Sequence, residues 1–207
     1  MTARDAIFAA LPPAGADPRA EAAALLTRVP ALRPDRVGAD PAASFLARLT
    51  GPVIAASAAR VAGLADVPGA VKAYLAAQNL SARVALQPVA ALRALDWGGV
   101  ETHDGIAVDE PVSICLAAYA VAETGSLVFH SGADMPVLFA FLPLHHLVVL
   151  RAADIVPWLE DAAAREAQQP APRNLNIVTG ASGTTDIEGL LVRGAHGPAS
   201  LHVILVG

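Results

Sequence analysis

The residues with the most chemical potential lie in a Gly/Ser/Thr-rich loop at positions 179–186. A short apolar strand is predicted just before this loop, at 176–178, and the spacing of Thr185 and Glu188 is that of a capping box, which predicts a short helix after it. Backbone amides left free between a strand and a helix N-terminus can bind phosphate or carboxylate. The candidate ligand-binding residues of this loop are Thr179, Gly180, Ser182, Thr184 and Asp186.

The same loop can also be a tight turn that leads into a well-capped helix. Asp186 and Glu188 would then oppose the helix dipole in the first turn and would repel a second anion. Arg193 and Gly194 would close the C-terminal end of that helix. No lysine follows the glycines, so the loop is not a Walker phosphate-binding loop. Spacing alone favours the capped turn.

A glutamate between two apolar strands is the second candidate. Glu123 lies in the segment Ala-Glu-Thr-Gly-Ser, where a carboxylate in apolar surroundings suits proton transfer or nucleophilic attack. Alternatively, Glu123 accepts backbone amides at a strand bend and Gly125 provides a bulge. Both interpretations fit the sequence. The neighbouring candidate ligand-binding residues are Thr124, Gly125 and Ser126.

The histidines offer a third kind of chemistry. His196, in Ala-His-Gly-Pro with Gly197 beside it as a candidate ligand contact, could act as a general acid or base, or could cap the helix expected before it. The adjacent His145 and His146 point to opposite faces of a predicted strand, so they cannot bind one metal together. Cys115 is the only cysteine and lies in an apolar run, where a buried, inert thiol is expected. We predict no metal site and no cofactor.

Composition narrows the class of protein. The chain has 207 residues, of which 55% are hydrophobic and 16% charged, a balance that excludes disorder and favours strands buried on both faces. The net charge of −5 and the 4% aromatic content argue against nucleic-acid binding. The longest stretch without charged residues, 135–150, is too short and too interrupted by proline to span a membrane. We expect a cytoplasmic protein without a secretory signal.

The elements that must position these residues alternate between helix and strand. Helical segments are expected at 2–11, 19–28 and 89–95. Further helices are expected to begin at Asp40-Pro41, at Asp66 and at Asp154, the last of them running to about 168. Strands are expected at 53–56, 83–86, 112–116, 126–129, 146–150, 176–178 and 201–206, the last two of them central. This order predicts an α/β domain at 39–207, preceded by a helical arm at 1–38 with a proline-rich connection.

Taken in order, several motifs resemble those of the LUD-domain family. They are Ala-Glu-Thr-Gly-Ser at 122–126, Leu-Pro-x-His-His at 142–146, Thr-Gly-x-Ser-x-Thr-x-Asp-Ile-Glu at 179–188, Gly-x-His-Gly-Pro at 194–198 and a terminal Leu-His-Val-Ile-Leu strand. The resemblance covers roughly residues 40–207. It implies a three-layer α/β/α fold of the NagB/RpiA/CoA-transferase type with a mostly parallel sheet. One departure is Gly183, which stands where the family commonly has an arginine able to clamp an anion.

The resemblance implies a role in the oxidation of L-lactate to pyruvate, beside partner subunits that carry iron–sulfur clusters. This chain lacks the cysteines for such clusters, so we expect an accessory, non-redox subunit that binds a small carboxylate or another anion. Two alternatives remain. The chain could be a CoA-transferase-like or isomerase-like enzyme that uses Glu123, or a structural interaction module in which 179–198 is only turn chemistry.

Overall fold

The computed structural model describes the chain except for residues 1, 12–16, 29–32, 34 and 186–188. It divides into two units, Met1–Asp35 and Arg36–Gly207. The first unit contains α1 (Ala3–Ala10) and α2 (Pro18–Leu26), as the alanine-rich segments predict. Thr2 and Asp5 form a capping box at α1, and Asp17 caps α2.

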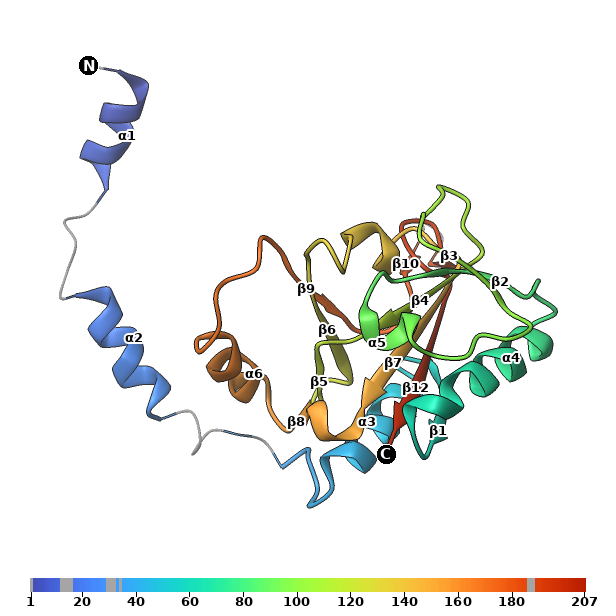
Figure 1. Cartoon of the computed structure of the whole chain (residues 1–207). Helices are drawn as coiled ribbons and strands as arrows, with labels where there is room; N and C mark the ends of the chain where they lie inside the picture. Colours follow the sequence, from blue (N-terminus) through green and yellow to red (C-terminus); the bar gives the residue numbers. More distant parts are fainter. Residues whose placement is uncertain (1, 12–16, 29–32, 34, 186–188) are drawn as a thin grey trace. The chain divides into compact units, whose positions relative to one another are not determined.

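The second unit is built on a six-stranded sheet in which all neighbouring strands are parallel (Figure 1). This confirms the predicted mostly parallel α/β fold. The strand order is β1 (Ser57–Val61), β12 (Ser200–Val206), β7 (His145–Arg151), β4 (Val112–Leu116), β2 (Arg83–Leu86) and β3 (Glu101–His103).

Both faces of this sheet are covered, which is why its strands are apolar on both sides. One face packs against α4 (Val67–Ala77) and α5 (Ala90–Arg93), where Ile204 of β12 lies in a cluster with Val71. The other face packs against α3 (Pro41–Leu49), where Val203 lies in a cluster with Phe45. Alternate residues of one strand therefore belong to two separate cores.

A second sheet completes the layer beside α3 (Figure 1). Its order is β8 (Ile155–Val156), β5 (Tyr119–Val121), β6 (Ser126–His130) and β9 (Leu175–Val178). Ala162 of α6 (Leu159–Glu166) packs on Tyr119 and Val128 of this sheet. Short 3₁₀ turns lie at η2 (Leu64–Asp66), η3 (Val137–Ala140) and η4 (Ala152–Asp154).

Two predicted elements near α3 and α6 are wrong. The segment 53–56 is a turn and not a strand: the amide of Ala55 bonds back to Gly51, and Ala55 has a φ of 53°. The helix expected from Asp154 begins only at Leu159, because the β-branched residues Ile155 and Val156 instead pair with β5. Tertiary strand pairing overrode the helix start signal at Asp154, whereas a hydrogen bond between near neighbours holds the turn at 53–56.

The most consequential correction concerns the segment after residue 182. In place of a short helix, the chain forms an antiparallel pair of β10 (Gly183–Thr185) and β11 (Leu191–Arg193). β-branched residues such as Thr184 and Val192, which face each other in this pair, favour strand over helix. Asp186 and Glu188 lie outside the described residues. The strand at 176–178 is also not central, because β9 is an edge strand whose one neighbour in the sheet is β6.

Within the described parts of the chain, no helix combines the length and the apolar character that crossing a bilayer requires.

Candidate functional site

The structure brings together two of the segments that the sequence singled out. Antiparallel pairing of β6 with β9 sets Leu127 opposite Val178. As a result the hydroxyl oxygens of Ser126 and Thr179 lie 2.6 Å apart, and Ser126 also donates to Thr124 at 2.7 Å. The predicted candidates Thr124, Ser126 and Thr179 therefore form one hydrogen-bonded hydroxyl cluster. Its members satisfy one another, so the cluster is first of all a connection between two strands.

The two glycines beside this cluster hold a third segment. Gly125 and Gly180 have φ values of +69° and +88°, which favour glycine. A Cβ at position 125 would lie 2.7 Å from Cδ1 of Ile54 and 2.9 Å from Cγ of Arg48. A Cβ at position 180 would lie 3.1 Å from Cγ2 of Ile54. Both glycines thus make room for the chain that follows α3.

The predicted anion loop loses the feature on which it depended. Residues 183–185 form a strand, so the described part of this segment has no helix N-terminus at Thr185. The amide of Ser182 donates to the carbonyl of Pro198 at 2.8 Å, and the Ser182 carbonyl accepts from the amide of Gly194 at 3.0 Å. Gly197 packs against Ser182, where a Cβ would lie 3.2 Å from the serine Cβ. Thr184 is exposed within the β10–β11 pair.

The two predicted catalytic residues have different surroundings. Glu123 is half-buried, and its Oε2 lies 3.5 Å from the amide of Leu159, the first residue of α6. That contact fits the interpretation of Glu123 as an acceptor for backbone amides. His196 is exposed and makes no hydrogen bond or ion pair with any residue that the structure describes. Catalytic roles for Glu123 and His196 stay predictions.

A cavity of about 250 Å³ lies where three strands of the parallel sheet end. Gln87 follows β2, Leu116 ends β4 and Arg151 ends β7. The second sheet closes the cavity with His130, the last residue of β6. The full lining is Gln87, Val89, Leu116, Ala117, Ala118, Phe129, His130, Asp134, Met135 and Arg151. We call this cavity the strand-end pocket.

The topology explains why a cavity opens there. After β2 the chain continues through α5, whose Leu92 packs in the core shared with α4. After the neighbouring β4 it continues through β5 and β6, on the opposite face. Adjacent strands whose connections leave to opposite faces create a crevice at their carboxyl ends, and ligands of open α/β sheets bind in such crevices. The strand-end pocket is in that position.

Gln87 fixes the wall of the strand-end pocket. Its side chain is 4% exposed, accepts from the amide of Leu116 at 2.6 Å and donates to the carbonyl of Asp134 at 2.8 Å. The glutamine thus joins the end of β4 to the loop that carries Asp134. Because both ends of its amide are occupied, Gln87 has a positioning role.

Contacts with Glu166 of α6 and with Asp154 of η4 hold two side chains of the strand-end pocket, His130 and Arg151. His130 Nε2 lies 2.8 Å from Glu166 Oε1, and Asp154 lies 3.8 Å from Arg151 and 3.5 Å from Arg165. Burial tends to raise the pKa of Glu166, but hydrogen bonds from Tyr119 and His130 and the nearby positive charges hold that pKa below its usual value. Glu166 is therefore an anionic partner that orients the ring of His130.

The sequence signal for this site is the polar residue that directly follows an apolar strand. Gln87, His130 and Arg151 each come immediately after a strand predicted at 83–86, 126–129 or 146–150. The sequence predicts the strands but does not single out these residues as a site, because only the parallel arrangement shows that the ends of the strands meet. Among the described residues, no group of three or more His, Cys, Asp or Glu side chains could hold a metal ion.

Comparisons with known proteins agree with this architecture. Residues 106–206 match the family described as the LUD domain. The chain is 30% identical over 112 residues to lactate utilization protein C of Anoxybacillus flavithermus, an alignment that covers 53% of this chain and 51% of that protein. It is 33% identical over 118 residues to the Bacillus subtilis protein of the same name, covering 54% and 49%. The chain thus spans about half the length of these curated relatives.

A solved structure extends the likeness in fold. The crystal structure of a DUF162 family protein from Deinococcus radiodurans aligns with a TM-score of 0.58 at 24% sequence identity. The alignment covers 82% of this chain and 98% of the other. At that identity the comparison speaks for the fold alone.

Proposed function

This chain resembles the LUD-domain family over residues 106–206, and on that premise we propose that it serves lactate utilisation as an accessory, non-redox subunit that binds a small carboxylate in the strand-end pocket. The relatives named lactate utilization protein C support the process. The observation that supports the site is the position of Arg151, a cation at the carboxyl end of a central parallel strand.

The lining of the strand-end pocket suits a 2-hydroxy or 2-oxo acid. Arg151 supplies the planar guanidinium that pairs with a carboxylate. Asp134 offers acceptor oxygens for a hydroxyl proton, which a 2-hydroxy acid has and a simple anion lacks. Phe129 and Met135 are buried and give an apolar surface for a methyl group. This combination of one cation, nearby acceptors and an apolar wall matches lactate better than it matches an inorganic anion.

The redox step would belong to partner chains with iron–sulfur clusters. Cys115 is fully buried, its thiol lies 3.8 Å from the carbonyl of Phe139, and burial raises its pKa well above its usual value. The thiolate, which is the form that binds metals and acts as a nucleophile, is therefore suppressed at Cys115. That chemistry supports a non-redox role for this chain.

Titration calorimetry with L-lactate and pyruvate tests the site. Arg151→Gln should weaken binding by about tenfold or more, because it removes a charge-assisted bidentate pair. Arg93, the last residue of α5, forms an ion pair with Asp104, and Arg93→Gln should leave binding unchanged. Equal affinity of the Arg151→Gln protein, or no binding by the wild type, would count against the site.

A genetic experiment tests the process separately. Deletion of the gene should abolish growth on L-lactate as carbon source, and the tagged chain should co-purify with an iron–sulfur protein. Normal growth of the deletion strain on L-lactate would reject the proposed process, whatever the calorimetry shows.

A further inference from the structure

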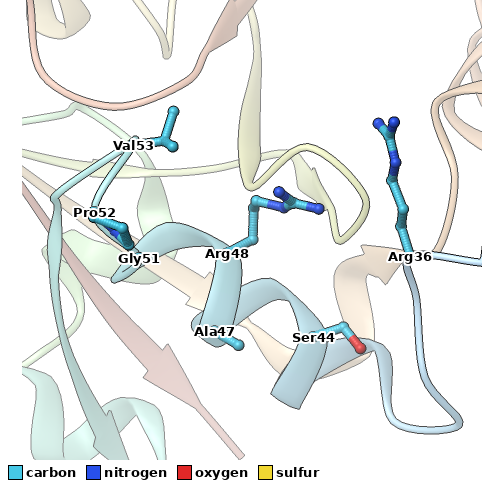
Figure 2. Close-up of a pocket in the computed structure, with 7 residues that line it drawn as sticks. All are labelled: Arg36, Ser44, Ala47, Arg48, Gly51, Pro52 and Val53. Atoms are coloured by element: carbon cyan, nitrogen blue, oxygen red, sulfur yellow. The ribbon is translucent and has the colours of Figure 1, made fainter.

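A second cavity lies on α3 and the turn after it. Its lining residues are distant in sequence from those of the strand-end pocket. It has a volume of about 360 Å³ and is lined by Arg36, Ser44, Ala47, Arg48, Gly51, Pro52 and Val53. Figure 2 shows the Arg48 side chain extending sideways from α3, toward the side on which the Arg36 side chain extends upward from the segment before the helix. We call this cavity the two-arginine groove.

The groove collects positive charge without a matching negative charge. Neither Arg36 nor Arg48 forms an ion pair or a side-chain hydrogen bond with another described residue, and the lining contains no Asp or Glu. Arg48 also lies in the last turn of α3, where a cation interacts favourably with the helix dipole. That interaction explains one arginine but not Arg36, which lies outside the helix.

Local hydrogen bonds keep Arg36 beside α3. The amide of Gly38 donates to Ser44 Oγ at 3.0 Å, and Ser44 in turn donates to the carbonyl of Asp40 at 3.0 Å. The Asp40 carboxylate caps the helix through the amides of Ala42 and Ala43. The segment that follows Arg36 is thus tied back to the first turn of α3.

Gly125 and Gly180 position two residues at the groove, Arg48 and the neighbour of Val53, Ile54. The stem of Arg48 lies across Gly125, where a Cβ would be 2.9 Å from the arginine Cγ. Ile54, just beyond the lining residue Val53, packs against both Gly125 and Gly180. The Glu-Thr-Gly-Ser and Thr-Gly segments therefore support the residues of the groove, although they do not line it.

From these contacts we propose that the two-arginine groove binds a phosphate group, either as free phosphate or on a small phosphate ester. Two guanidinium groups balance the dianion, and each can donate two parallel hydrogen bonds to its oxygens. Bringing two like charges to one cavity is unfavourable unless an anion offsets the repulsion. The groove is open and its exposed wall residue Val53 is apolar, which leaves room for the organic part of an ester.

Calorimetry with inorganic phosphate and with glycerol 3-phosphate, at constant ionic strength, tests the proposal. Arg48→Met keeps the hydrophobic stem on Gly125 but removes the guanidinium, and Arg36→Gln removes the second cation. Each substitution should weaken binding by about tenfold or more. Arg93→Gln is the matched control for the loss of one positive charge and should bind as the wild type does.

The outcomes separate the sources of the phosphate. Tighter binding of glycerol 3-phosphate than of inorganic phosphate identifies an ester as the ligand, and equal binding identifies the phosphate group itself. Retained affinity in both Arg36→Gln and Arg48→Met, or no binding by the wild type, overturns the proposal. Circular dichroism of each variant confirms that a loss of binding is not a loss of fold. The result is independent of Arg151 and of lactate binding.

Discussion

The hydroxyl oxygens of Ser126 and Thr179, 53 residues apart in the chain, lie 2.6 Å from each other across the β6–β9 pair. This hydrogen bond joins the Glu-Thr-Gly-Ser segment to the Thr-Gly segment. It lies beside the two glycines that accommodate Ile54. The motifs that the sequence suggested as a ligand site thus also form a structural junction between the second sheet and α3.

Breaking this junction should reduce stability by a modest amount. Ser126→Ala and Thr179→Val should each lower the free energy of unfolding by about 1 kcal/mol, the usual net effect of one such hydrogen bond. The double variant should cost less than the sum, because both substitutions remove the same bond. Urea denaturation of the four proteins measures the coupling. Strict additivity would show that the two hydroxyls do not interact in solution.

Gly125→Ala should be far more destabilising than a typical surface substitution. It combines a left-handed backbone with a Cβ 2.7 Å from Ile54 Cδ1, so we expect a loss of roughly 2–5 kcal/mol. Thermal and urea unfolding would measure it. Gly189→Ala is the matched control, because Gly189 has a φ of +82° but a Cβ added there would have no heavy atom of the described residues within 4 Å, its two chain neighbours aside. It should cost only about 1 kcal/mol.

A rescue experiment measures how much of the loss at position 125 comes from steric overlap with Ile54. Adding Ile54→Val to Gly125→Ala removes the methyl group that the new Cβ would meet. The double variant should recover part of the lost stability. A double variant no more stable than Gly125→Ala would assign the loss to backbone strain and to the contact with Arg48, whose Cγ the new Cβ would approach to 2.9 Å.

Acid should destabilise the protein through buried histidines. Burial lowers the pKa of His146 to about 3 and that of His202 to about 4. Below pH about 6.5 the unfolded chain binds protons at these rings while the folded chain does not, so stability falls as the pH decreases toward those values. Each ring should contribute on the order of 1.4 kcal/mol per pH unit within its window. Denaturation curves recorded between pH 7 and 4.5 measure the slope.

His146→Leu isolates one of these rings. The side chain of His146 is fully buried, and neither ring nitrogen has a hydrogen-bond partner among the described residues. An apolar side chain of similar size should therefore raise stability at pH 7 by about 1–3 kcal/mol and flatten the acid slope by about one proton. A variant with the wild-type slope would show that His146 is not the titrating group.

Substitutions of Glu123 test whether the protein is an enzyme or a binding subunit. Glu123→Gln keeps an oxygen that can accept from the amide of Leu159, so stability should change by no more than about 0.5 kcal/mol. Glu123→Leu removes the acceptor at the start of α6 and should cost about 1 kcal/mol. If Glu123 were a nucleophile, an acyl-CoA-dependent activity of the wild type would vanish in Glu123→Gln. A wild type without that activity removes the enzymatic alternative.

Local sequence signals were sufficient to predict a helix or strand where backbone preference and burial agree. The apolar runs at 146–150 and 201–206 predicted strands, the second of them central, and the structure confirms both in β7 and β12. Asp40-Pro41 predicted the start of α3, where the Asp40 carboxylate accepts two amides. These features depend on neighbours within a few residues, or on strands so apolar that both faces must be covered.

The sequence by itself determined the most apolar strands and the parallel sheet that they form, because side-chain type decides which strands must be buried. It could not decide between helix and strand at 183–193, where Thr185 and Glu188 signal a helix start but β-branched residues pair instead. Nor could it show that the ends of β2, β4 and β7 meet, which places Gln87 and Arg151 around one cavity. Contacts between residues far apart in the chain exist only once the strands have been ordered, and that order is a property of the folded molecule.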